Sequence, residues 1–567
     1  MNSTLRILLL THAFNSLTQR LYVELTAPGH ELSVEFDIND AVTTEAVDLF
    51  RPHLIIAPFL KRAIPEAIWR EHVCLIVHPG IVGDRGPSAL DWAVQEGEAE
   101  WGVTLLQAEA EMDAGPVWAA ETFAMRQAMK SSLYRNEVTE AALRCVLTAL
   151  DRWPDFRAGR WQPHRLADRP DARGRLRPLM RQSDRALDWG QDDTATVLAR
   201  LHAADGFPGV LDRLFGQPCR LFNARSYPAH GRAGEVLGRA GEGVVRATVD
   251  GAIWIGYVKR DGEMPIKLPV IQAFHEAIDL PELDAQPVDP IRYEEADGVG
   301  YLHFDFYNGA MGTAACERLR AAYVAARQRP TRVIVLMGGS DFFSNGLDLN
   351  RIEAAQSPAD ESMRNIEAMD DLCREVIETD SHLTVAALRG NAGAGGAFLA
   401  LAEDQVWARS GIVLNPHYKN MGNLYGSEYW SYLLPWRVGI EGAAPIMQHR
   451  LPLGTPAAKA AGFIDDCFAA EPAAFTAEVM RCAADLAASS DFTARLAAKC
   501  ERRASDEQAR PLQAYRDAEL ARMQRNFYGF DPSYHVARHH FVHRTPHSWT
   551  PRHLARHREL GWQIPVS

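Results

Sequence analysis

The sequence predicts an α/β protein with several domains, and three observations lead to this fold class. The chain has 567 residues, which is more than one hydrophobic core usually supports. Short apolar runs alternate with helical patterns twice, over residues 5–150 and again from about residue 297. Strand-like pieces separated by glycines fill residues 206–285 between these regions, which indicates a small β-barrel domain.

The first region, residues 1–150, has the pattern of a parallel α/β sheet. Parallel strands need crossover connections, and helices are the usual ones. Residues 151–205 follow as a linker rich in Arg, Pro and Asp up to residue 178, with a short helix at about 193–203. We expect buried strands at Arg6–Thr11, His53–Ala57 and Val73–His78, and helices at Leu17–Leu25, Thr44–Phe50 and Ser88–Glu96.

The second α/β region is expected at residues 286–470, followed by a helical extension over 471–567 that ends in a stretch rich in Arg, His and Pro. Its strands are predicted at Val299–Phe306, Val333–Met337 and Leu383–Leu388.

Composition excludes several classes of protein. A net charge of −13 argues against a general nucleic-acid binder, because phosphate contacts need clustered Lys and Arg. No apolar run is long enough to span a membrane, and the run Ile7–Leu10 is too short for a signal peptide. The eight cysteines are scattered without a CxxC pair, which predicts neither a zinc site nor disulfides and fits the cytoplasm.

A histidine and an aspartate form the candidate site of the first region. His78 follows a buried strand, where α/β proteins place catalytic groups, and Asp113 lies in a turn downstream. A histidine held by a carboxylate makes a general acid/base. For either residue alone the structural interpretation is favoured, so the pair is a hypothesis that needs its context.

The order of the surrounding motifs resembles the 10-formyltetrahydrofolate-dependent formyltransferases. The motifs are His78-Pro79, the run 102–104 (GVT) and the run 113–116 (DAGP). The resemblance covers residues 5–125 well. It extends more weakly through residues 207–209 (FPG) into the β-domain, which is similar to the C-terminal domain of methionyl-tRNA formyltransferase.

This resemblance implies that His78 and Asp113 are catalytic and that 10-formyltetrahydrofolate is bound. Gln19 and Arg135 are candidate contacts for the polar groups of the folate, although both also fit solvent-facing helix positions. The catalytic asparagine of the family falls on Ile76. Losing such an oxyanion donor costs roughly 3 kcal/mol. Either another group donates in its place or the acceptor is not an amine, and a thiol is one candidate acceptor.

Two glycine-containing turns mark the second region, at residues 342–349 and 389–397. Such turns expose backbone N–H groups, and two of them can form an oxyanion hole. Together with the runs 308–311 (NGAM) and 457–466 (AAKAAGFIDD), they resemble the crotonase (enoyl-CoA hydratase/isomerase) superfamily over about 290–470. The resemblance implies a coenzyme A (CoA) thioester whose carbonyl is held by the N–H groups of Leu347 and Gly395, with Gly346 and Gly396 beside them.

The acid/base positions of this region depart from the hydratase pattern. The two glutamates of the hydratases fall on Phe398 and His417, so water addition is not expected. Tyr418 and Glu428 are the candidate proton-transfer groups in their place. The alternative is that this aromatic segment only packs against the core, which we favour for Tyr429, Trp430 and Tyr432.

The histidine-rich tail predicts no metal site. His539 and His543 would share one face of a helix. No Cys or Glu accompanies them at a familiar ligand spacing, and the interspersed arginines oppose a cation. A solvated or packing segment is expected instead.

The fusion as a whole resembles the HypX (HoxX) family of hydrogenase maturation factors. Residues 14–19, 425–430 and 511–529 carry this resemblance beyond the two halves. It implies formyl transfer from 10-formyltetrahydrofolate to CoA, followed by decarbonylation of formyl-CoA to CO and CoA. The CO would become a ligand of the [NiFe] hydrogenase iron, with hydrogenase maturation proteins or the hydrogenase large subunit as candidate partners.

Two other functions stay open from the sequence. One is an amine formyltransferase fused to an enzyme of another acyl-CoA, which Ile76, Phe398 and His417 disfavour. The other is a non-catalytic, CoA-binding scaffold for hydrogenase assembly, which the presence of both His78 and Asp113 disfavours.

Overall fold

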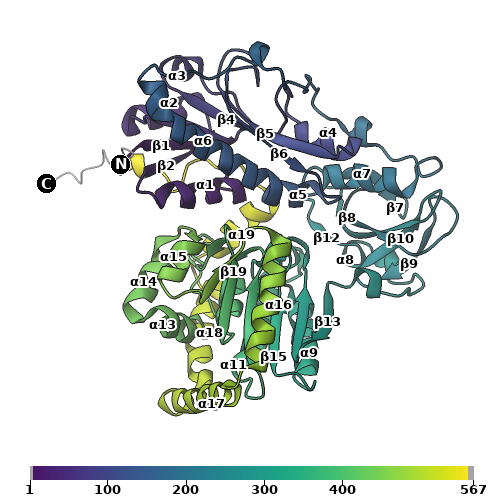
Figure 1. The fold of residues 1–567 in the computed structure, drawn as a ribbon. Helices are drawn as coiled ribbons and strands as arrows, with labels where there is room; N and C mark the ends of the chain where they lie inside the picture. The colour runs from purple at the N-terminus through teal and green to yellow at the C-terminus, as the bar shows by residue number, and fades with distance from the viewer. Residues whose placement is uncertain (1–3, 560–567) are drawn as a thin grey trace. The chain divides into compact units, whose positions relative to one another are not determined.

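The computed structural model describes residues 4–559, and the chain forms two compact units (Figure 1). The first unit comprises the chain up to Val288 together with the segment from Pro546 onward, and the second comprises Asp289–Thr545. The stretch 471–567, expected to form one extension, is therefore divided between the two units. Between residues 4 and 559, no helix has both the length and the apolar character needed to cross a membrane.

The first unit opens with a six-stranded sheet in the order β2-β1-β3-β4-β5-β6. Strands β1 to β4 pair in parallel, as expected, but β5 and β6 are antiparallel, so the predicted parallel sheet is in fact mixed. The short loop between β5 and β6 permits a hairpin but no crossover, which accounts for the antiparallel pairing of these two strands. The strands are Arg6–Thr11, Glu31–Phe36, Leu54–Phe59, Cys74–His78, Glu100–Gln107 and Val117–Ala124.

Helices connect these strands and begin where the sequence supplies caps. Asn15 and Asn39 accept hydrogen bonds from the N–H groups of Thr18 and Val42, at the starts of α1 and α2. Helix α6 continues seven residues into the stretch expected to be an irregular linker, because its apolar face packs on β5 and β6. The helices are α1 Ser16–Thr26, α2 Asp40–Phe50, α3 Glu66–Glu71, α4 Ala89–Glu96, α5 Lys130–Leu133, α6 Thr139–Arg157 and α7 Thr194–Ala204.

The strands predicted as a small barrel form an antiparallel sheet in the order β7-β8-β11-β10-β9, with β12 beside β11. Val197 and Leu201 of α7 enter its core. The strands are Val210–Leu214, Gln217–Tyr227, Val236–Ala240, Gly243–Ala247, Ala252–Arg260 and Lys267–Pro269.

The second unit has a six-stranded sheet in the order β13-β14-β15-β17-β19-β22, which is parallel except for β13. A smaller sheet has the order β16-β18-β20-β21. Its first two strands, β16 and β18, follow β15 and β17 along the chain. The strands are β13 Ile291–Ala296, β14 Val299–Phe304, β15 Val333–Met337, β16 Phe342–Ser344, β17 Leu383–Leu388, β18 Asn391–Gly393, β19 Gln405–Arg409, β20 Val413–Asn415, β21 Leu453–Gly454 and β22 Asp466–Phe468.

Helices cover both faces of this sheet. Helix α16 (Pro472–Ala488) runs along one face, where Phe475, Val479 and Ala483 meet alternate residues of β15 and β17 (Figure 1). The opposite core contains α9 (Thr313–Ala326), α11 (Pro358–Ile377), α12 (Gly395–Leu401) and α18 (Leu512–Tyr528). The apolar strand runs are explained by this burial on two sides.

The last described segment completes the first unit through a buried carboxylate. Glu35 on β2 is fully buried and lies 2.9 Å from His557 Nε2 and 2.8 Å from Arg558 Nη2. The other ring nitrogen of His557 lies 2.7 Å from Ser33 Oγ. Hydrogen bonds lower the pKa of Glu35 despite a burial that by itself would raise it. The carboxylate therefore stays charged and depends on these partners.

We expect His557→Ala to lower the free energy of unfolding by about 3 kcal/mol, because it leaves a buried carboxylate short of a partner. Urea unfolding of the full chain measures this change. The matched control is His230→Ala, an exposed histidine of the same unit, which should stay within about 0.5 kcal/mol of wild type. Equal stability of the two variants would show that the contact contributes nothing.

Candidate functional site

His78 ends β4 and lies between two carboxylates. Its Nε2 atom is 3.0 Å from Asp84 Oδ1, and its Nδ1 atom is 3.6 Å from Asp113 Oδ2. The imidazole is 4% exposed and the Asp84 side chain is fully buried. The structure thus brings the predicted His78 and Asp113 together, but the carboxylate within hydrogen-bond distance is Asp84, which the sequence analysis missed.

The loop after β4 places Asp84 by folding back over the ring. A Cβ atom on Gly80 would lie 2.5 Å from His78 Nε2 and 2.7 Å from Asp84 Oδ1, so only glycine allows this approach. Arg177 Nε lies 3.2 Å from the second oxygen of Asp84. An aspartate six residues after a strand-end histidine was the only available signal in the sequence.

Asp113 is held by the backbone of the same loop. Its φ angle of 54° is in the left-handed region. Its Oδ2 atom accepts the Gly86 N–H at 3.1 Å. This oxygen also faces His78, so the carboxylate is oriented before any substrate binds.

Ile76 provides no polar group at the strand position where the related enzymes have asparagine. It lies two residues before His78, opposite Leu106 of β5, and packs against the apolar core of the sheet. An oxyanion donor for a formyl group would have to come from elsewhere.

The two predicted folate contacts lie on elements that meet. Gln19 is on α1 and donates its Nε2 to the Phe14 carbonyl at 2.8 Å. Arg135 is on a short π-helix, Tyr134–Val138. Asn15, the cap of α1, lies 3.3 Å from the Tyr134 hydroxyl and joins the two elements. Both side chains are half-buried.

In the second unit the two glycine turns come into contact. A Cβ atom on Gly346 would lie 3.1 Å from the Gly395 amide nitrogen. Among the described residues, neither the Leu347 N–H nor the Gly395 N–H donates to a protein acceptor. Two adjacent, unused donors are what an oxyanion hole requires. Gly396 is buried, and a Cβ there would meet the Ser344 carbonyl at 2.2 Å, so it allows close packing of α12.

Glu428 and Tyr418 lie beside these turns. The Tyr418 hydroxyl is 2.6 Å from Glu428 Oε2. A Cβ atom on Gly395 would lie 2.1 Å from Glu428 Oε1, so the carboxylate occupies the space that the glycine leaves open. Burial raises the pKa of Glu428 to about 8 and the pKa of Tyr418 well above its ordinary value. The predicted donors and proton-transfer groups are therefore together at one place.

Two buried carboxylates that the sequence analysis missed hold this segment. Asp370 on α11 accepts the Glu428 N–H at 2.7 Å, and Glu519 on α18 accepts the Tyr429 N–H at 3.0 Å. Glu428 and Tyr429 both have left-handed φ angles, 58° and 57°, which these bonds stabilise. Burial raises the pKa of Asp370 to about 7 and that of Glu519 to about 8.

The positions of the two hydratase glutamates are filled by other groups. Phe398 stacks on Tyr418 with ring centroids 5.4 Å apart and planes 13° from parallel. His417, the residue before Tyr418 in the chain, is also buried. No carboxylate pair for positioning water remains at these two positions.

Comparison with protein families divides the chain as its geometry does. The formyl transferase family matches residues 31–150, and the formyl transferase C-terminal domain matches residues 179–272. The enoyl-CoA hydratase/isomerase family matches residues 295–550, which includes the helices up to α19 (Ser533–His543). A methionyl-tRNA formyltransferase of Roseiflexus castenholzii is 30% identical over 34% of this chain and 59% of its own length.

A hydrogenase maturation factor HoxX of Bradyrhizobium diazoefficiens is 55% identical over 98% of this chain and 97% of its own length. The chain belongs to the HypX (HoxX) family of hydrogenase maturation factors. A crystal structure of HypX from Aquifex aeolicus in complex with tetrahydrofolic acid is 48% identical, with a TM-score of 0.94 over 99% of this chain and all of that one. The combination of a formyltransferase half and a crotonase half is thus a property of the HypX family.

The raised pKa values of Asp370, Glu428 and Glu519 predict how stability depends on pH. Carboxyl groups of an unfolded chain ionise at about pH 4, whereas these three keep their protons to about pH 7–8 in the folded protein. The folded state binds more protons in this window, so the free energy of unfolding falls as pH rises through it.

Glu428→Gln mimics the protonated group. It should reduce the fall in the free energy of unfolding between about pH 5 and pH 8 by on the order of 1 kcal/mol or more. Urea unfolding at a series of pH values measures it. Glu441→Gln, at an exposed glutamate of the same unit, is the control and should leave the slope unchanged. An unaltered slope in Glu428→Gln would contradict the prediction.

Proposed function

We propose that the protein makes CO for [NiFe] hydrogenase maturation from 10-formyltetrahydrofolate in two steps, with CoA as the carrier. Family membership and the tetrahydrofolic acid complex of the Aquifex protein support the formyl donor. The match to the enoyl-CoA hydratase/isomerase family supports CoA. The observation that carries the proposal is Glu428 lying against the Gly395 turn in a unit without the hydratase glutamates.

In the first step, the CoA thiol attacks the formyl carbon of 10-formyltetrahydrofolate at the His78 site. Asp84 fixes the tautomer by accepting the Nε2–H of His78, which leaves Nδ1 to take the thiol proton. That proton then lies toward Asp113, 3.6 Å away, before it passes to the leaving nitrogen. The C–S bond forms, the C–N bond breaks, and the products are formyl-CoA and tetrahydrofolate. A thiolate nucleophile fits a site that has Ile76 in place of an asparagine.

In the second step, the N–H groups of Leu347 and Gly395 hold the formyl oxygen. Glu428 Oε1 removes the formyl proton, the C–S bond breaks, CO leaves, and the proton passes to the CoA thiolate. Glu428 is the better base of the two candidates, because its pKa of about 8 lets the carboxylate form near neutral pH. The pKa of Tyr418 is raised well above 10 by burial, so Tyr418 stays protonated and orients Oε2.

All eight cysteines are free, which fits a reducing compartment, and we place the reaction in the cytoplasm. The partners proposed to receive the CO are hydrogenase maturation proteins or the hydrogenase large subunit, in keeping with the family's role.

Two variants should separate the two steps. His78→Asn is expected to lose formyl transfer by about 100-fold or more, since it removes the general base, yet to release CO from added formyl-CoA. Glu428→Gln is expected to convert 10-formyltetrahydrofolate and CoA to formyl-CoA that accumulates. CO is measured by its haemoglobin adduct, and formyl-CoA by chromatography.

His230→Ala should behave as wild type in both assays. The proposal fails if the wild-type protein produces no CO, or if CO production persists in Glu428→Gln. A formylated amine as the product would instead support an amine formyltransferase.

A further inference from the structure

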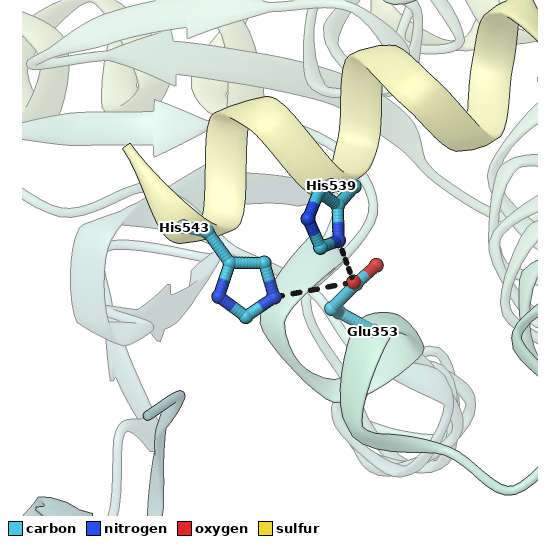
Figure 2. A group of neighbouring side chains, drawn as sticks. All are labelled: Glu353, His539 and His543. Carbon is cyan, nitrogen blue, oxygen red and sulfur yellow. Dashed lines mark hydrogen bonds and ion pairs between the residues drawn. The ribbon is translucent and has the colours of Figure 1, made fainter. Parts of the chain in front are cut away.

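Three side chains from two helices of the second unit converge on one point (Figure 2). Glu353 lies on α10 (Leu349–Ala354), and His539 and His543 lie one turn apart on α19. His539 Nδ1 is 2.8 Å from Glu353 Oε1, and His543 Nε2 is 3.2 Å from the same oxygen. Figure 2 shows both rings directed at this oxygen.

The hydrogen bonding defines which atoms carry protons. A glutamate carboxylate only accepts hydrogen bonds, so each of the two imidazole nitrogens in contact with Oε1 donates a proton to it. These two protons occupy the position where a cation would contact all three ligand atoms.

We propose that Glu353, His539 and His543 bind a first-row divalent transition-metal ion such as Zn²⁺. Two histidines four residues apart on a helix with a glutamate from another helix form a ligand set that zinc uses with water in the fourth position. Ligand atoms around tetrahedral zinc are roughly 3.3 Å apart, close to the 2.8 and 3.2 Å seen here. His539 is 39% exposed, which gives the ion and its water a route from solvent.

The positive charge of Arg538 opposes a cation, but its hydrogen bond also orients the Glu353 carboxylate. Its Nε atom lies 2.7 Å from Oε2, the oxygen that faces away from the histidines. A second group that orients a metal ligand in this way is a common feature of metal sites. The sequence alone does not reveal this site, because Glu353 is 186 residues from His539 and only the fold brings them together.

The test uses the full-length protein, stripped of metal with a chelator, with Zn²⁺ and Co²⁺ as probes. Calorimetry should show Zn²⁺ binding, and Co²⁺ should give visible d–d absorption without a thiolate charge-transfer band. His539→Ala, His543→Ala and Glu353→Gln should each weaken binding at least about tenfold. His540→Ala changes an exposed histidine of the same helix and should bind as wild type.

Circular dichroism establishes that each variant is folded. His539 is the most exposed of the three ligands, so His539→Ala decides the test if the other variants do not fold. The proposal is overturned if wild type binds no Zn²⁺, if His539→Ala binds as tightly as wild type, or if Co²⁺ shows the thiolate band of a cysteine site. None of these readouts depends on formyl transfer or CO release.

Discussion

The backbone of residues 427–431 is fixed by two buried carboxylates, and the geometry of the candidate site in the second unit depends on this constraint. Asp370 and Glu519 accept the N–H groups of Glu428 and Tyr429 while these residues hold left-handed φ angles. That backbone turns the Glu428 side chain into the space left by the missing Cβ of Gly395. Burial of charged groups is costly, and here it is compensated by backbone donors and by retained protons.

The sequence predicts the parts of this site that arise from local pattern. Strands β15 and β17 lie where the apolar runs place them, and the glycine turns after them carry Leu347 and Gly395. Asp370 and Glu519 could not be predicted, because their partners are backbone amides 58 and 90 residues away. A long-range contact between a carboxylate and a backbone N–H leaves no spacing in the sequence.

The same limit applies to the formyltransferase half. His78 could be predicted because it ends a buried strand, and Asp113 because it lies in a recognisable turn. Asp84 could not, because its position depends on the loop closing at Gly80 and on Arg177 from the stretch expected to be a linker. The mixed sheet was missed for a related reason, since strand direction depends on loop geometry that the apolar runs do not encode.

The path of the chain constrains how the two units can be separated. The second unit, Asp289–Thr545, is inserted between parts of the first, because the segment from Pro546 returns to β2. A cut after residue 545 would remove His557 and Arg558 and leave Glu35 buried with neither of these charged partners. A leading part of the chain that ends before residue 546 is therefore expected to be unstable. Folding thus ties the formyltransferase-like part of the chain to the segment that follows the second unit.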